Sequence, residues 1–360
     1  MKLLITLDFP PEIGGIQRYL YDIVRFTFTA DDRVMIGCTR NPRISYKELK
    51  AKMTWASTPL SFLNKKLSCI PLFAHFFILA GHVKKVDEIT CGNVYAGLVP
   101  WVASFFIRVR YAVYTHGTEI LFLQKKPFRG WILKKVLKRA DRLFSNSRYT
   151  ASLLKDAGIT TEPAIVPPRI KIPLPPKNTE KMQAIDGKLS EGRIPQILCV
   201  GRLVPRKGFI DALQALALLP SDMQWRCVIA GDGPLGQELL TFCFNKKINQ
   251  RVILKKALSD EDLSAEYDRS SIFVLPGARE GGVEGFGIVV IEAMAHRVPV
   301  IAGRTGGVAE VLENGACGIL VEPGDIVGLS REIQILLSDA GLRERLAAAA
   351  FERVKRYYAW

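Results

Sequence analysis

Short apolar runs rich in β-branched residues alternate with longer amphipathic segments through both halves of the chain. In the first half the pattern predicts strands at 3–7, 34–38 and 112–115 and a helix at 15–28. In the second half it predicts strands at 196–200, 225–230, 252–254, 272–275 and 299–302, with helices at about 207–219, 234–248, 260–268, 285–296 and 307–313. Such alternation is typical of an α/β fold, in which helices cover both faces of a parallel sheet.

A proline-rich stretch interrupts the alternation near the middle of the chain. Seven prolines occur from residue 163 to residue 195, and no hydrophobic period continues after Ile172. We therefore predict an N-terminal domain at 1–170, a linker at 171–195 and a C-terminal domain at 196–360. A length of 360 residues fits two doubly wound domains better than one core. Ligands of such sheets bind beyond the carboxyl ends of the strands, so a cleft between the domains is the expected site.

All of the excess positive charge lies in the first half of the chain. Residues 1–172 hold 27 Lys and Arg against 12 Asp and Glu, whereas residues 173–360 hold 23 of each, and the whole chain carries +15. This asymmetry indicates an anionic partner for the first half: a membrane surface, a nucleic acid or a phosphorylated substrate. A basic surface that serves only solubility is the alternative.

One basic segment has the pattern of a helix that lies on a membrane surface. It spans 128–139 and is expected to place Phe128, Trp131, Ile132 and Val136 on one face, with Lys134, Lys135 and Lys138 elsewhere. A second apolar run, 63–85, is bracketed by lysines. Both predict contact with anionic lipid, and the alternative is that these apolar faces pack on the first sheet.

Several features indicate a cytoplasmic protein. The longest apolar run, 67–81, is shorter than the roughly 20 residues that cross a bilayer, and the apolar start of the chain is too short for a signal peptide. The seven cysteines form no C-x-x-C pair, so we expect buried reduced thiols and no metal site. Together with the basic segment, this predicts a peripheral protein on the inner face of the cytoplasmic membrane.

Glycines and cations at strand ends are candidates for holding phosphate. Gly14 and Gly15 follow the first strand and open the first helix, where free N–H groups attract anions. Gly231 and Gly233 belong to a G-x-G-x-x-G stretch at 231–236, but its place deep in the second half, away from the first strand of a domain, argues against a dinucleotide fingerprint. Two cations after the strand at 196–200 suit a diphosphate, Arg as a fork and Lys as a point charge: Arg202 and Lys207.

Carboxylates and a histidine at other strand ends could hold sugar hydroxyls. Glu284 and Glu292 are eight residues apart, which predicts one face of a helix that begins after Gly285. Phe286 and Gly287 complete this glycine-rich entry, and His116 follows the strand at 112–115. The D-x-D pattern at 260–262 is interpreted as a helix start capped by Ser259 and not as a metal site.

Together these motifs resemble glycosyltransferase family 4, a group of retaining enzymes with the GT-B fold. The resemblance runs from Lys2 to about Trp360 and rests on seven ordered segments: 11–15, 115–117, 145–147, 200–208, 230–234, 280–294 and 306–310. It implies a metal-independent hexosyltransferase with no cofactor, whose donor is a UDP- or GDP-linked sugar. The implied acceptor is a glycan or a lipid-linked molecule in cell-surface polysaccharide, lipopolysaccharide or glycolipid synthesis.

The resemblance also implies roles for individual residues. Gly14 and Gly15 would offer N–H groups to the donor phosphate, and Arg202 and Lys207 would grip the diphosphate. His116 would lie near the transferred sugar. Glu284 would bind sugar hydroxyls and Glu292 the ribose, within a donor site that also includes Gly231, Gly233, Gly285, Phe286 and Gly287.

The chain departs from the family pattern in three places. Pro168-Arg169 replaces Asn-Gly at the linker, Lys256 stands near an expected glycine, and the sequence ends at Trp360 where relatives continue into a helix that crosses to the first domain. Two other functions are alternatives. A GT-B sugar-nucleotide epimerase would need more acid–base residues than His116 and Glu119, and a nucleic-acid binder would need regular aromatic stacking platforms.

Overall fold

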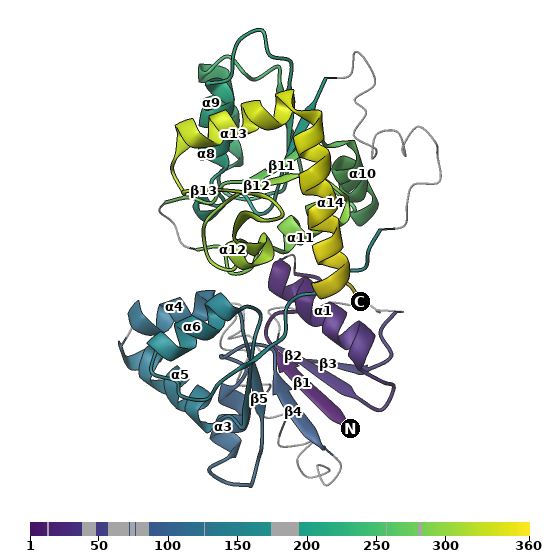
Figure 1. Cartoon of the computed structure of the whole chain (residues 1–360). Coiled ribbons are helices and arrows are strands. Elements are labelled where there is room, and N and C mark those ends of the chain that lie inside the picture. Colours follow the sequence, from purple (N-terminus) through teal and green to yellow (C-terminus); the bar gives the residue numbers. More distant parts are fainter. Residues whose placement is uncertain are drawn as a thin grey trace. The chain divides into compact units, whose positions relative to one another are not determined.

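The computed structural model describes residues 1–12, 14–37, 48–56, 72, 76, 86–125, 127–173, 194–256, 258–279 and 283–360. Within them the chain divides into two compact units, Met1–Pro168 and Arg169–Trp360. Each unit has its own parallel sheet with helices packed around it (Figure 1). The predicted α/β fold with two Rossmann-like domains is therefore confirmed. The linker at 171–195 lies mostly outside the described residues, and the exact domain limits and the cleft stay predictions.

The first unit is a parallel sheet in the order β3-β2-β1-β4-β5-β6-β7. Its strands are β1 (Lys2–Thr6), β2 (Arg33–Gly37), β3 (Lys52–Ala56), β4 (Glu88–Cys91), β5 (Ala112–Thr115), β6 (Arg142–Ser145) and β7 (Ala164–Ile165). Its helices are α1 (Gly15–Thr27), α3 (Leu98–Ala103), α4 (Thr118–Lys125), α5 (Pro127–Arg139) and α6 (Arg148–Asp156). The strand order reverses between β1 and β4, where a doubly wound sheet leaves room for a ligand at its carboxyl edge.

The second unit has a parallel sheet in the order β10-β9-β8-β11-β12-β13. Its strands are β8 (Gln196–Val200), β9 (Arg226–Ala230), β10 (Val252–Lys255), β11 (Ile272–Leu275), β12 (Val300–Gly303) and β13 (Ile319–Val321). Its helices are α8 (Phe209–Ala217), α9 (Gly236–Asn245), α10 (Asp260–Arg269), α11 (Ile288–Ala295), α12 (Val308–Val311), α13 (Ile326–Ser338) and α14 (Ala340–Tyr357). The order reverses between β8 and β11, which places the loops after these two strands at one ligand-binding edge.

Burial of both sheet faces explains the apolar strands. Every residue of β8, β11 and β12 is buried, as expected for parallel strands covered by helices on both sides. Helix α14 packs on α11 through Ala350 and Val354, and it was not predicted from the sequence. The end of the chain returns to the start of this unit, where the N–H of Trp360 donates to the carbonyl of Ile170.

The described residues bear on two further predictions, which concern the cysteines and membrane-spanning segments. The cysteines there, namely Cys91, Cys199, Cys227, Cys243 and Cys317, are buried and form no disulfide, whereas Cys38 and Cys69 lie outside the described part. In the same part of the chain, none of the helices has the length and apolarity needed to cross a bilayer.

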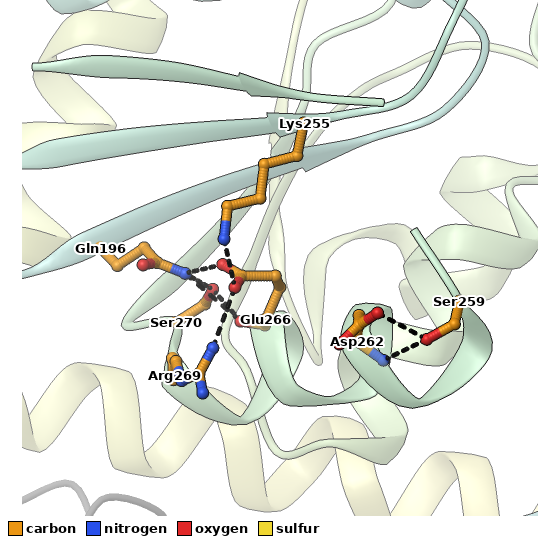
Figure 2. Close-up of polar contacts among 7 residues, drawn as sticks. All are labelled: Gln196, Lys255, Ser259, Asp262, Glu266, Arg269 and Ser270. Carbon is orange, nitrogen blue, oxygen red and sulfur yellow. Dashed lines mark hydrogen bonds and ion pairs between the residues drawn. The ribbon is translucent and has the colours of Figure 1, made fainter. Parts of the chain in front are cut away.

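A buried carboxylate ties α10 to the second sheet (Figure 2). Glu266 accepts hydrogen bonds from Lys255 at 2.9 Å and from the Gln196 amide at 3.0 Å, and Arg269 lies 3.1 Å away. Burial alone raises the pKa of Glu266, but Lys255 and Gln196 outweigh burial and hold the pKa below its ordinary value. At the start of the same helix Ser259 accepts from the N–H of Asp262, which confirms the predicted cap. Helix α10 is thus fixed at both ends.

We expect Glu266→Ala to lower the free energy of unfolding by about 2–3 kcal/mol, because it leaves the buried Gln196 amide without its carboxylate partner. The exposed Glu261→Ala on the same helix should cost about 0.5 kcal/mol or less. Because the pKa of Glu266 is lower in the folded state, its contribution is complete above the ordinary carboxyl pKa. The difference between the two variants should therefore shrink as the pH falls through the lowered pKa. Urea titrations across acidic pH measure this, and equal losses in both variants would contradict it.

Candidate active site

A buried ion pair occupies the carboxyl edge of the second sheet. Lys207 ends a short 3-10 turn, Pro205–Lys207, in the loop after β8, and its Nζ lies 2.8 Å from Oε2 of Glu284. The two side chains are only 9% and 13% exposed. Burial by itself raises the pKa of Glu284, but the Lys207 ammonium outweighs burial and holds the pKa below its ordinary value, with a smaller effect from Arg206. Glu284 is therefore an ionised carboxylate at neutral pH.

The position of Glu284 corrects one prediction. Helix α11 begins at Ile288, so Glu284 precedes the helix and does not share a helical face with Glu292. The cause is Gly287, whose φ of 85° takes the backbone out of the right-handed helix at this point. Glu284 instead lies in the loop that follows β11, where it reaches Lys207 from a neighbouring strand end. The two glutamates are positioned by different local structures.

Two glycines of the 306–310 motif hold the backbone of this loop in place. A Cβ on Gly306 would lie 1.6 Å from the carbonyl oxygen of Glu284, so that no larger residue fits without displacing the loop. The neighbouring Gly307 donates its N–H to the carbonyl of Gly285 at 3.2 Å. The position of the Glu284 carboxylate therefore depends on close backbone contact with the loop after β12.

The glycines after β9 have a similar packing role. A Cβ on Gly231 would lie 1.9 Å from the oxygen of Gly201, and one on Gly233 would lie 2.5 Å from the oxygen of Leu203. Gly201 in turn leaves space for the Lys207 side chain, whose Cε would be 3.3 Å from an added Cβ. The loops after β8 and β9 thus pack backbone to backbone. This packing accounts for the glycine spacing without a dinucleotide.

The remaining residues predicted for the donor lie around this edge. Arg202 is exposed on the loop after β8, the loop that also carries the buried Lys207. The ring of Phe286 is buried and packs edge-on against Tyr358 at 6.0 Å, so the ring supports the loop and is not displayed to a ligand. Arg206, which sequence reasoning passed over, adds positive charge near Glu284. Its only signal was its place next to Lys207.

Glu292 is held by a tyrosine from another helix. The hydroxyl of Tyr267 on α10 donates to Oε2 of Glu292 on α11 at 2.9 Å. Burial, together with the Glu292 carboxylate, raises the pKa of Tyr267 well above its ordinary value, so the phenol stays a donor. The ring stacks on His296, whose Nδ1 lies 2.7 Å from Asp268. No sequence pattern predicted this contact, because the two partners lie on separate elements.

The first unit gathers polar groups at its own carboxyl edge. His116 follows β5, is 3% exposed, and places Nε2 at 2.7 Å from the carbonyl oxygen of Gly92 after β4. A carbonyl only accepts, so Nε2 carries the proton and Nδ1 of the neutral ring is an acceptor. The backbone N–H of His116 donates to Glu119, whose pKa is raised by burial. The imidazole is therefore held in one orientation and tautomer.

Other groups at this edge surround the start of α1. Gly14 precedes the helix without a side-chain cap, and no acidic residue occupies the first turn that Gly15 begins. Asp8, which follows β1, accepts from Gln17 at 3.1 Å and from the Asn93 amide. Sequence reasoning missed Asp8 and Asn93, which lie two residues after the ends of β1 and β4.

In the basic helix α5, the residues predicted to share one apolar face do not all lie on it. Val136 is completely buried in the first core, whereas Trp131 is 55% exposed, with Nζ of Lys135 lying 5.5 Å from the centre of its ring. The two side chains cannot share one face, because five residues turn a helix by about 140° beyond a full turn. Val136 thus packs in the core, as the alternative interpretation predicted. Trp131 is exposed on the same helix as Lys134, Lys135 and Lys138. The side chain of Phe128 and nearly all of 63–85 lie outside the described part.

Among the described residues, no group of three or more His, Cys, Asp or Glu side chains is placed to hold a metal ion. Metal independence stays a prediction from the family resemblance.

Comparison with known proteins identifies the family. The model described as Glycosyltransferase Family 4 matches residues 13–170, and the one described as Glycosyl transferases group 1 matches residues 182–353. Together the two models account for most of both units. The chain belongs to glycosyltransferase family 4 and is a glycosyltransferase.

Two relatives are similar along nearly the whole chain. A GDP-mannose-dependent monoacylated alpha-(1-6)-phosphatidylinositol monomannoside mannosyltransferase of Corynebacterium glutamicum is 29% identical, over 99% of this chain and 94% of the relative. A GDP-mannose-dependent alpha-(1-6)-phosphatidylinositol monomannoside mannosyltransferase of Mycolicibacterium smegmatis is 26% identical, over 94% and 89%.

Solved structures share the fold. Anabaena HepE in complex with UDP and glucose superposes with a TM-score of 0.81 at 21% identity, covering 100% of this chain and 96% of its own. Sucrose-phosphate synthase from Thermosynechococcus elongatus gives a TM-score of 0.83 at 20% identity, covering 100% and 95%. At these identities the likeness concerns the fold.

We expect Gly306→Ala to lower turnover about 100-fold or more, because the added methyl group displaces the Glu284 backbone from the reacting geometry. Gly315→Ala is the matched control, since Gly315 also has a positive φ of 108° but has open space around it. Steady-state rates with the accepted donor, beside thermal melting of both variants, measure the effect. Equal rates in the two variants would show that the contact at Gly306 does not position Glu284.

Proposed function

We propose that this chain is a retaining hexosyltransferase that moves a sugar from a nucleoside diphosphate to a lipid-linked or glycan acceptor in cell-surface glycan synthesis. The observation that carries the proposal is the ion pair of Lys207 and Glu284 at the carboxyl edge of the second sheet. It places a cation that could bind a diphosphate next to a carboxylate that could bind sugar hydroxyls, and a nucleotide sugar carries these two groups side by side. The full set of family motifs supports the same assignment.

The donor diphosphate is assigned to the cations of the second unit. Arg202 is exposed and offers a planar fork for phosphate oxygens, and Lys207 supplies a buried positive charge. As the sugar leaves, negative charge grows on the β-phosphate. A fixed ammonium in a site shielded from water stabilises that charge more than water would. This arrangement supplies the stabilisation without requiring a metal ion.

The donor sugar is assigned to Glu284 and the ribose to Glu292. An ionised Glu284 accepts hydrogen bonds from sugar hydroxyls, and charge-assisted bonds of this kind are the stronger ones. Its partner Lys207 lies 2.8 Å away, so one pair contacts both sides of the bond that breaks. The two relatives that match nearly the whole chain are GDP-mannose-dependent enzymes, so GDP-mannose is the first donor to test.

The transfer step follows the retaining scheme of the family. The bond between the anomeric carbon and the β-phosphate oxygen breaks, and the acceptor hydroxyl forms its bond on the same face. The acceptor proton passes to the departing phosphate oxygen, so the products are the glycoside and the nucleoside diphosphate. His116 and the start of α1 at Gly14 and Gly15 are assigned to the sugar and phosphate in this step. The fixed orientation of the His116 ring, held by the Gly92 carbonyl, supports the positioning part of its role.

We expect Glu284→Gln to lower turnover about 100-fold or more, since the neutral amide neither holds sugar hydroxyls as strongly nor balances Lys207. The exposed Glu352→Gln on α14 is the control and should keep the parent rate. The assay is release of nucleoside diphosphate from a panel of GDP-, UDP- and ADP-sugars with lipid-extract acceptors. A parent protein that cleaves none of these donors would refute the proposed function, whereas an active Glu284→Gln would refute the role of Glu284.

Membrane contact is proposed for the basic first unit. Trp131 is displayed on α5 beside lysines, which is the pairing that interfacial helices use. A second aromatic feature follows α3, where Phe105 and Phe106 are 68% and 73% exposed on a turn fixed by backbone hydrogen bonds. Arg108 and Arg110 come next along the chain and are exposed. Apolar rings beside arginines suit a surface of anionic lipid, in keeping with a lipid-linked acceptor.

We expect the protein to float with phosphatidylglycerol vesicles at low salt and to release from them at about 1 M salt, where charges are screened within about 3 Å. Trp131→Ser combined with Phe105→Ser should reduce the bound fraction several-fold, because each ring contributes buried apolar area. Phe244→Ser, which removes a similarly exposed ring from the half of the chain that has no net charge, is the control. Absence of binding at low salt would overturn the proposed membrane contact and leave the transferase proposal standing.

A further inference from the structure

The contact between Tyr267 and Glu292 joins a buried tyrosine to the carboxylate assigned to the nucleotide. Tyr267 is 2% exposed, and its hydroxyl reaches Oε2 of Glu292 at 2.9 Å. Glu292 itself is half-buried on α11. A glutamate side chain has three rotatable bonds, so a fixed partner decides where its carboxylate lies. The phenol is a partner of this kind.

The tyrosine cannot move freely, because its helix is anchored on the sheet. Its neighbour Glu266 is bound by Lys255 and Gln196, two residues of different strands (Figure 2). Ser270 at the end of the helix donates to the carbonyl of Glu266. The Gln196 amide also donates to Oγ of Ser270 at 3.1 Å, so residues on both sides of Tyr267 are tied to the sheet that carries the candidate site.

The ring of Tyr267 is also fixed from its other side. His296 stacks on it, with ring centres 5.1 Å apart and an angle of 18° between the planes. His296 is in turn held by Asp268, the residue after Tyr267, at 2.7 Å. Helix α10 therefore supplies a phenol whose position is set on every side before any ligand arrives.

We propose that Tyr267 is a positioning residue that fixes the Glu292 carboxylate against the ribose hydroxyls, so that the site selects ribonucleotides over deoxyribonucleotides. The inference rests on the proposed function, which assigns Glu292 to the ribose. A fixed carboxylate forms a good hydrogen bond only with a hydroxyl at one position. A nucleotide without that hydroxyl leaves the desolvated carboxylate without that hydrogen bond. A carboxylate free to rotate would discriminate less.

A purely structural role for the phenol makes a different prediction. The Tyr267 hydroxyl also lies 3.3 Å from the carbonyl of Val289, in the first turn of α11. If the hydroxyl served only to join the two helices, its removal would lower stability and weaken all nucleotides alike. Selection between ribose and deoxyribose separates the two roles.

The test measures binding of GDP and UDP, and of their 2′-deoxy and 3′-deoxy forms, by calorimetry. The proteins are the full-length parent, Tyr267→Phe, Glu292→Gln and the double variant. We expect Tyr267→Phe to weaken the preferred ribonucleotide about tenfold, the effect of one hydrogen bond to a charged group, and to leave the deoxy form nearly unchanged. In the Glu292→Gln background the same substitution should change affinity less than about twofold, because Tyr267 acts through Glu292.

Tyr358→Phe is the matched control, since Tyr358 is another buried tyrosine of this unit, which follows α14 and packs against Phe286. It should keep the selection for ribose whatever it does to the melting temperature. The inference is overturned if Tyr267→Phe keeps the parent's selection, or if its effect is as large without Glu292. If the parent and Tyr267→Phe both prefer ribonucleotides to the same extent, this inference alone is refuted. If the parent binds no nucleoside diphosphate, the proposed function is refuted as well.

Discussion

The buried pair of Lys207 and Glu284 is the interaction on which the candidate donor site depends. Two charges withdrawn from water cost several kcal/mol each unless they are closely paired, so the loops that carry them must be held accurately. Here the lysine lies beside Gly201, and the glutamate carbonyl lies against Gly306. The glycine motifs of this unit are therefore explained first by the close approach of backbones around one ion pair. Their sequence signal reflects this packing.

In both units, polar side chains gather at the carboxyl edge of the parallel sheet, at the point where the strand order reverses. In the second unit the reversal of strand order between β8 and β11 brings Lys207 and Glu284 together from segments far apart in sequence. In the first unit the reversal between β1 and β4 places Asp8 near Asn93, with His116 held against Gly92. Each edge contains polar side chains already fixed by hydrogen bonds. Fixed groups lose little freedom when a ligand binds, which favours catalysis by preorganised charge.

The sequence predicted the parts of this structure that depend on local pattern. Alternating apolar runs located β8 to β12, and Ser259 correctly marked the start of α10. Predictions that placed residues on one face of a helix were wrong: Gly287 separates Glu284 from α11, and the buried side of α5 includes Val136 but leaves Trp131 exposed. The contact of Tyr267 with Glu292 had no local signal, because only the packing of α10 on α11 brings the two together. The site residues could thus be proposed from motifs, whereas the interactions that orient them required the fold.

The central claim is that Lys207 and Glu284 together hold the diphosphate and the sugar of one donor. A crystal structure of the protein with an intact, non-transferable nucleotide sugar tests it most directly. The account predicts phosphate oxygens within hydrogen-bonding distance of the Lys207 ammonium and of Arg202, and a sugar hydroxyl donating to the Glu284 carboxylate. A donor bound elsewhere, with the ion pair of Lys207 and Glu284 buried and untouched, would contradict it.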